Sequence, residues 1–224
     1  MLTPLGESIW HAQSQIGLAP GIRLPLNMAV VRVGDGSLLL YSPIRIDDEL
    51  ATELAELGEV RYLVAPNTFH HLHLEAAQNR YPEAKTFGPS GLSDKTGAQL
   101  DAPLSEHPPI PLDGIRFLPI GGIPKLNEWV LIHEPSQTLV VSDLVFNIMD
   151  PPTWLTGLVN RLAGVYRRCG ISRIFKTQIK DPEAFSNSIQ ALLELPFDRI
   201  AMAHGQLLPS GAKEVLRAEI AAYL

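Results

Sequence analysis

Three of the seven histidines occupy four consecutive positions of the segment NTFHHLHLEAA, as His70, His71 and His73. Imidazole is the commonest metal ligand in proteins and also a general acid or base near neutral pH. His70 and His73 are three residues apart at a predicted helix start, so both could turn toward one ion. The alternative is a polar helix entry whose imidazoles make ordinary hydrogen bonds. The density of histidines favours a metal or catalytic site.

An aspartate and a histidine each follow an apolar run later in the chain. Asp143 comes after TLVVS and His204 comes after RIAMA, so both are expected near the ends of buried strands. A buried carboxylate needs a compensating partner, and a metal ion is one such partner. The alternatives are that Asp143 caps a turn and that His204 bonds a backbone carbonyl before Gly205.

Other chemically capable residues have simpler explanations. Cys169 lies beside two arginines in YRRCGIS, but no histidine is near it in sequence, and an inert thiol is the better interpretation. Glu128 could line a pocket or be an ordinary charge at a strand end. A locally basic stretch could meet an anionic substrate, although a solvated helix face is the better explanation. Its members are Arg161, Arg167, Arg168, Arg173, Lys176 and Lys180.

The elements that carry the first candidates read as a strand, a loop, a helix and a strand. Residues 60–66 form a strand-like run before the histidines, a helix is predicted over 72–81, and AKTFGP is a short strand. Apolar runs over 28–33 and 38–44 flank an Asp-Gly step and predict a hairpin. Asp47 or Asp48 can cap a helix that ends at Gly58.

The second half again places strands before helices. Strands are predicted over 115–120, 128–134, 138–147 and 199–205, and helices over 152–166, 182–193 and 210–224, the last capped by Ser210. The first two of these helices have proline in the first turn. Two halves of this kind predict an α/β fold of four layers, an αββα sandwich of two mixed sheets with helices outside. We expect one domain over 1–224.

These motifs together resemble the metallo-β-lactamase superfamily, and in particular a bacterial branch described as a domain of unknown function. The signature of that superfamily is His-x-His-x-Asp-His after a strand, then a later histidine, an aspartate after a strand, and a histidine followed by glycine. The corresponding segments here are NTFHHLHLEAA, VVSDLVF and MAHGQ, with Asn27 before the first hairpin. The resemblance covers most of the chain and implies the same αββα fold.

The sequence departs from that signature at several positions. With His73 on its last histidine, His70 takes the second, but Thr68 and Leu72 replace the first histidine and the aspartate. A one-residue slip of the register places Asn67 and His71 at those positions instead. GGIPKLNEWV replaces the loop that holds the middle histidine, and Tyr41-Ser42-Pro43 replaces the Asp-Thr-Gly that ends the first hairpin.

The resemblance therefore implies His70, His73, Asp143 and His204 as metal ligands. A catalytic zinc needs about three protein ligands and one open position, so one ion is feasible and two are not. The resemblance favours His73, Asp143 and His204 for that ion, with His70 as a fourth ligand or as a supporting group. The lost aspartate would orient the attacking water, so hydrolysis would need a substitute such as His71 or Glu128, and neither is a clear replacement.

The sequence is compatible with three functions. The first is a hydrolase of an ester, thioester, lactone or phosphoester that uses one divalent metal, with zinc ahead of iron and manganese. The second is a metal-free binding or regulatory protein of the same fold. The third, which some members of the superfamily support, is an iron-dependent oxidoreductase. Each acts on a small-molecule substrate or ligand that the sequence does not identify.

Composition narrows the class of partner. The chain has 224 residues, 46% hydrophobic, with 18 Lys and Arg against 24 Asp and Glu, so nucleic acid and membrane are not expected partners. The single cysteine permits no intrachain disulfide, and the first residues lack the pattern of a signal peptide, so we expect a cytoplasmic protein. The segment WLTGLVNRLAGVY carries enough apolar residues for a homodimer contact, although core packing explains them equally well.

Overall fold

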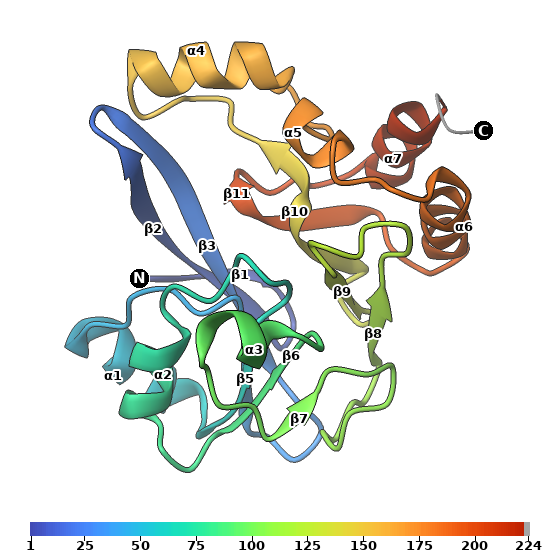
Figure 1. The fold of residues 1–224 in the computed structure, drawn as a ribbon. Coiled ribbons are helices and arrows are strands. Elements are labelled where there is room, and N and C mark those ends of the chain that lie inside the picture. The colour runs from blue at the N-terminus through green and yellow to red at the C-terminus, as the bar shows by residue number, and fades with distance from the viewer. Residues whose placement is uncertain (222–224) are drawn as a thin grey trace.

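The computed structural model describes residues 1–221 and contains two β-sheets (Figure 1). The first sheet has seven strands in the order of the chain, and β1 to β4 are antiparallel whereas β4 to β7 are parallel. Pairing of Val30 with Leu40 confirms the predicted hairpin. The strands are β1 (Leu2–Gly6), β2 (Ile9–Ala19), β3 (Ile22–Arg32), β4 (Leu38–Tyr41), β5 (Val60–Val64), β6 (Lys85–Gly88) and β7 (Ala102–Pro103).

The second sheet has four strands in the order β11-β10-β9-β8. Its strands β8, β9 and β10 are antiparallel neighbours, and β11 is parallel to β10. Both sheets are therefore mixed, as the sequence predicted. The strands are β8 (Ile115–Pro119), β9 (Trp129–His133), β10 (Thr138–Asn147) and β11 (Arg199–Gly205).

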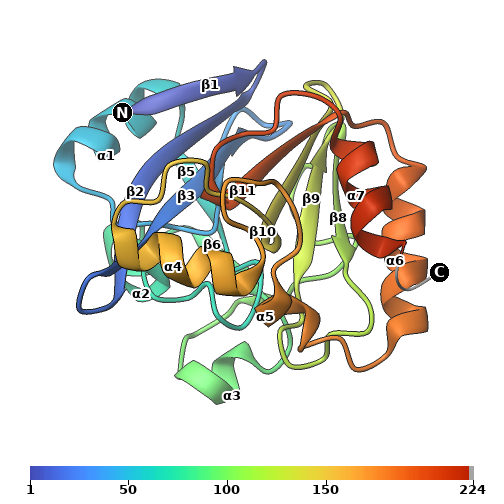
Figure 2. The same cartoon turned by 90° about the horizontal axis from the view of Figure 1, so that it is seen from above.

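Helices cover the outer face of each sheet. The helices α1 (Asp48–Leu57), α2 (Leu74–Arg80) and α3 (Leu92–Thr96) contribute Leu54, Leu74 and Leu92 to the core outside the first sheet. The helices α5 (Arg173–Lys176), α6 (Pro182–Leu193) and α7 (Ala212–Ile220) pack on the second sheet. Helix α4 (Trp154–Ala163) lies across one end of the sheets, beside the β2–β3 hairpin (Figures 1 and 2). This is the αββα sandwich expected from the sequence.

A third hydrophobic core lies between the two sheets. Alternate residues of the first sheet, such as Val31 and Tyr41, face Phe117, Leu131 and Val140 of the second. These side chains are almost completely buried. Burial on that scale is the main term that stabilises a sandwich fold, since each large apolar side chain contributes about 1.5 to 3 kcal/mol. Strands β10 and β11, which contribute to this core, also carry the candidate residues Asp143 and His204.

Some element boundaries differ from the sequence prediction. Strands β1 and β2 and the short elements β7, α3 and α5 were not predicted. Helix α4 begins after its two prolines, with Thr153 as the N-cap, because the Thr153 hydroxyl accepts the Thr156 N–H. The N-cap of α7 is Gly211 in a left-handed conformation, so the assignment of Ser210 was wrong. The last three residues of the predicted helix over 210–224 lie outside the described residues.

Candidate metal centre

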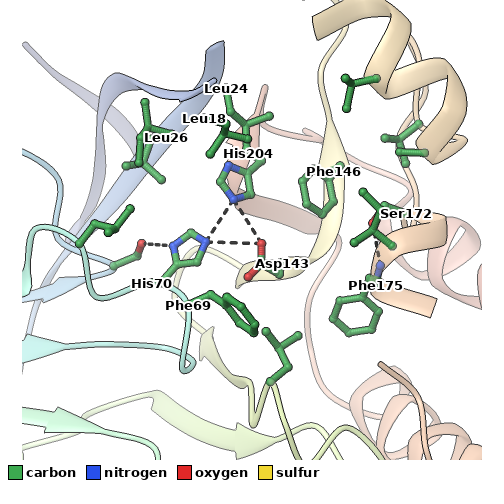
Figure 3. Close-up of a pocket in the computed structure, with 18 of the residues that line it drawn as sticks. Leu18, Leu24, Leu26, Phe69, His70, Asp143, Phe146, Ser172, Phe175 and His204 are labelled. Atoms are coloured by element: carbon green, nitrogen blue, oxygen red, sulfur yellow. Dashed lines mark hydrogen bonds and ion pairs between the residues drawn. The ribbon is translucent and has the colours of Figure 1, made fainter. Parts of the chain in front are cut away.

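His70, Asp143 and His204 converge at the edge of the sandwich (Figure 3). The Nε2 atoms of the two histidines lie 3.1 Å apart. Asp143 Oδ1 lies 3.5 Å from His70 Nε2 and 3.2 Å from His204 Nε2. Each residue comes from a different part of the chain, so the fold assembles the group.

His70 is held by one contact to its backbone and one to its imidazole ring. The Asn67 side-chain oxygen accepts the backbone N–H groups of Phe69 and His70, which forms a tight turn directly after β5. The His70 ring is then held by Ser42, whose Oγ lies 2.8 Å from Nδ1. Ser42 is buried and has a φ of 58°, a left-handed conformation that is uncommon for a residue other than glycine. Such strain at the end of β4 is typical of positions that a site requires.

Asp143 lies in a bulge of β10. Pairing with β11 is regular up to Val141 and resumes at Phe146, so the segment between them leaves the ladder. Buried backbone N–H groups need partners, and Glu128 supplies them here. Its carboxylate oxygens accept the N–H groups of Ser142, Asp143 and Leu144 at 2.9, 3.1 and 3.2 Å. Glu128 therefore holds the backbone that presents Asp143.

His204 is oriented by a backbone carbonyl and an aromatic ring. Its Nδ1 donates to the Pro25 carbonyl oxygen at 2.8 Å, because that oxygen can only accept. The Phe146 ring stacks on the imidazole at 5.0 Å between centroids. In the neutral form this hydrogen bond leaves Nε2 with a free electron pair that faces Asp143.

The two buried carboxyl groups have opposite pKa shifts. Burial alone would raise the pKa of Asp143, but His70 and His204 outweigh it and hold that pKa well below its ordinary value. Burial, and then the neighbouring charge of Asp143, raise the pKa of Glu128 to about 8, although the backbone N–H groups oppose this. Asp143 is therefore the carboxyl group that stays charged at neutral pH.

The donor set fits one divalent metal ion. Two imidazoles and a carboxylate are ligands that zinc and iron accept. Ligand atoms about 2.0 to 2.1 Å from a tetrahedral zinc lie about 3.3 Å from one another, and the three distances here are 3.1, 3.2 and 3.5 Å. Electron pairs converging this closely require a cation or protons between them. The Pro25 and Ser42 contacts are the supporting hydrogen bonds that metal-bound histidines usually make.

The three histidines of the predicted cluster lie in different surroundings in the structure. His70 joins Asp143 and His204, whereas His73 begins α2 as its N-cap and is not a member of the group. In the structure, His70 takes the place beside Asp143 and His204 that the sequence analysis gave to His73. His71 lines a different, polar cavity, and burial and then Lys95 lower its pKa. Asp143 and His204 lie together as the fold prediction required.

The two suggested substitutes for the missing water-orienting aspartate do not fill that role. Glu128 is completely buried and occupied by backbone N–H groups, and His71 lines the separate, polar cavity. Cys169 is partly buried, and burial raises the pKa of its thiol to about 11, so it is protonated at neutral pH. Sequence reasoning missed Asn67 as a positioning residue, although its place between a strand and the histidines was a signal.

A largely apolar cavity of about 450 Å³ opens over the three converging residues (Figure 3). Its walls come from the β2–β3 hairpin, the histidine loop, α4 and α5. Asp143 keeps 19% of its side chain exposed toward this space, so a ligand in the cavity can reach the carboxylate. The apolar side chains include Leu18, Leu24, Leu26, Phe69, Phe146, Val159, Val165, Ile174 and Phe175.

Comparison with known proteins identifies the fold. A family model described as a domain of unknown function, DUF4336, matches residues 6–92. No curated protein matches the sequence. Among the described residues, no helix is long and apolar enough to cross a membrane.

Three similar solved structures are all metallo-β-lactamases. The first, from Pontibacter korlensis, is 14% identical, with a TM-score of 0.68 over 100% of this chain and 98% of that chain. FIM-1 from Pseudomonas aeruginosa, in its mono-zinc form, is 14% identical, with a TM-score of 0.67 over 100% and 96%. A protein from Erythrobacter litoralis is 13% identical, with a TM-score of 0.69 over 99% and 96%. At such low identity this likeness establishes the fold.

Proposed function

We propose that this chain, which has the metallo-β-lactamase fold, is a hydrolase that uses one divalent metal and acts on a substrate with a large apolar part. The observation that carries the proposal is the convergence of His70, Asp143 and His204 on one point in the wall of an apolar cavity. Zinc is the first choice, and iron and manganese are the alternatives.

Each part of the site has a role in this proposal. His70, Asp143 and His204 would hold the ion, and the remaining coordination positions would face the cavity. A bound metal of this kind polarises a carbonyl or phosphoryl oxygen and lowers the pKa of water. Asn67, Ser42, Glu128 and Pro25 keep the ligands in place, so little reorganisation is needed when substrate binds.

The cavity supports an ester, thioester, lactone or phosphoester attached to an acyl or alkyl chain. Leucine, valine and phenylalanine side chains gain stability by removing such a chain from water, about 0.8 kcal/mol for each buried methylene group. A charged β-lactam would gain little from these walls, so β-lactams are not the expected substrates. The apolar surroundings would also exclude water from the ligands.

His73 is a candidate proton carrier at this site. It lines the cavity without joining the three ligands. Burial, and then the charge of Arg45, lower its pKa, so its imidazole is neutral at pH 7 and can accept a proton. Among the described residues that line the cavity, His73 is the one titratable group outside the proposed ligands.

The alternative function is a metal-free binding protein for apolar molecules. One observation favours it: among the described residues lining the cavity, Asp143 is the single carboxylate, so no second carboxylate is present to orient water. In this case the cavity binds a ligand and the three converging residues form a hydrogen-bond network that uses protons in place of the ion.

Hydrolysis panels would decide between the two functions. The protein would be loaded in turn with zinc, iron and manganese and assayed on short-chain and long-chain esters, thioesters, lactones and phosphodiesters. We expect slow turnover that favours long chains and is abolished by Asp143→Ala but retained by the matched surface variant Asp150→Ala. Equal rates for wild type and Asp143→Ala on every panel would contradict the hydrolase and favour the binding protein.

A further inference from the structure

The charge of the chain is distributed unevenly. Residues 151–180 contain six Lys and Arg and no Asp or Glu, although the whole chain has a net charge of -6. The chain therefore contains a basic region although its net charge is negative. This region begins before α4 and ends just before α6.

The same region exposes large apolar side chains along one helix face. Trp154, Leu158 and Leu162 of α4 are 75%, 44% and 68% exposed, and their spacing of four residues places them on one side of the helix. Ile174 of α5 is also exposed, as is Leu18 in the β2–β3 hairpin. We call these five residues the apolar edge.

The three elements that carry the apolar edge are joined by hydrogen bonds. The Thr153 hydroxyl, just before α4, donates to the Gly21 carbonyl oxygen at the hairpin tip, and Arg173 Nη1 donates to the Leu162 carbonyl oxygen. These bonds join the hairpin to the start of α4 and α5 to its end. Both views of the fold show the three elements along one end of the molecule (Figures 1 and 2).

Several cations beside this edge have no carboxylate partner. Arg168 and Lys176 both pair with Glu219, so this one carboxylate balances one of their two charges. The guanidinium groups of Arg161 and Arg167 instead lie against the Tyr166 ring, with the nearer one 4.0 Å from its centroid, and Arg173 bonds a helix carbonyl. Within residues 1–221, no ion pair involves Arg161, Arg167, Arg173 or Lys180.

We propose that the apolar edge and its free cations dock this protein on the surface of an anionic membrane. Exposed leucine and tryptophan side chains on a helix with basic neighbours are the pattern of helices that lie in a bilayer interface. The apolar edge would enter the headgroup region while the arginines contact lipid phosphates. The sequence analysis expected no membrane partner because the net charge of the whole chain is negative. The positive charge of residues 151–180 removes that reason.

Two other binding partners would match this surface less well. A second copy of the chain placed on the edge would bring two basic regions together, which is unfavourable. A nucleic acid would neutralise the arginines but leave Trp154 and Leu162 in water. An anionic bilayer meets both needs. Leu18 and Ile174 also line the cavity, so docking would turn the cavity mouth toward the lipid, although docking itself does not depend on the proposed hydrolysis.

Vesicle flotation of the full chain tests this proposal. Vesicles of phosphatidylcholine alone are compared with vesicles that also contain phosphatidylserine. We expect binding to the anionic vesicles only, and a loss of binding at high salt. Each cation near the surface contributes about a fivefold factor in affinity, so Arg161→Gln should weaken binding by about that factor. Lys85→Gln, an exposed lysine on β6, is the matched control and should bind as the wild type does.

Leu158→Gln and Leu162→Gln supply the apolar arm of the test. Both side chains are exposed, so the variants should fold, which circular dichroism would verify. We expect each to reduce vesicle binding at least severalfold. Failure of the wild type to float with anionic vesicles would overturn the proposal, and so would equal binding to uncharged vesicles. A concentration-dependent dimer that Leu158→Gln abolishes, without vesicle binding, would assign the edge to a second copy instead.

Discussion

Asn67 donates a hydrogen bond of 2.9 Å from Nδ2 to Oδ2 of Asp143, while its side-chain oxygen holds the backbone N–H of His70. One amide therefore ties the histidine loop after β5 to the bulge of β10. The same Nδ2 lies 2.9 Å from the Ser142 hydroxyl oxygen. Two proposed ligands that are distant in sequence thus share a single positioning residue.

Asn67→Ala should weaken metal binding although Asn67 is not a ligand. Loss of hydrogen-bonded support for a ligand typically lowers metal affinity by about 10- to 100-fold. The unpaired polar groups left behind should also reduce the free energy of unfolding by about 1 to 3 kcal/mol. Competition with a chromogenic chelator would measure the affinity, and urea denaturation the stability. An unchanged affinity would remove Asn67 from the site.

Glu128→Ala should destabilise the protein strongly. Three buried backbone N–H groups would lose their acceptor, and each unsatisfied group costs about 1 to 3 kcal/mol. We expect the free energy of unfolding to fall by about 3 to 5 kcal/mol, with loss of metal binding because the Asp143 backbone is no longer held. Glu194→Ala, a change at the C-terminal cap of α6, is the control and should have a small effect.

The raised pKa of Glu128 makes the stability of the metal-free protein depend on pH. A carboxyl group whose pKa is about 8 in the folded state and 4.5 when unfolded binds its proton more tightly when folded. Its contribution is fully present below pH 4.5 and is lost as pH rises through about 8. Urea denaturation in the presence of chelator should show this decline in wild type. The decline should be absent from Glu128→Gln, and a persisting decline would assign it elsewhere.

Val159→Trp should block the cavity without removing the metal. Val159 faces the cavity from α4, and a tryptophan there would occupy space that an acyl chain needs. Each methylene group kept in water costs about 0.8 kcal/mol, so exclusion of two or more should weaken binding of a fluorescent long-chain fatty acid by about tenfold or more. Metal content should be unchanged. Undiminished binding of the probe would show that apolar ligands bind elsewhere.

Strong local signals in the sequence determined much of the fold. The predicted bounds of α6 and β11 match the structure, because a proline after Asp181 marks the helix start and an apolar run is followed by His204 and Gly205. Strands β1 and β2 were missed because few of their residues are buried and they lack a regular apolar alternation. The β2–β3 hairpin projects beyond the sheet core, so its sequence is not constrained to alternate.

The candidate site was predictable in part. Asp143 and His204 follow apolar runs, and parallel pairing of β10 with β11 brings their strand ends together. The choice between His70 and His73 depends on the turn that Asn67 forms, which spacing alone cannot give. Glu128 was recognised as a residue near the site. Its role as acceptor for the backbone N–H groups of β10 depends on a bulge that no local sequence pattern predicts.

Metal content tests the central claim most directly. The proposed ligands of the ion are His70, Asp143 and His204, whereas His73 lines the cavity outside this set. Elemental analysis after incubation with zinc and removal of free metal should find one equivalent in wild type and in His73→Ala, and none in His70→Ala. Retention of metal by His70→Ala with its loss from His73→Ala, or no metal in the wild type, would contradict the account.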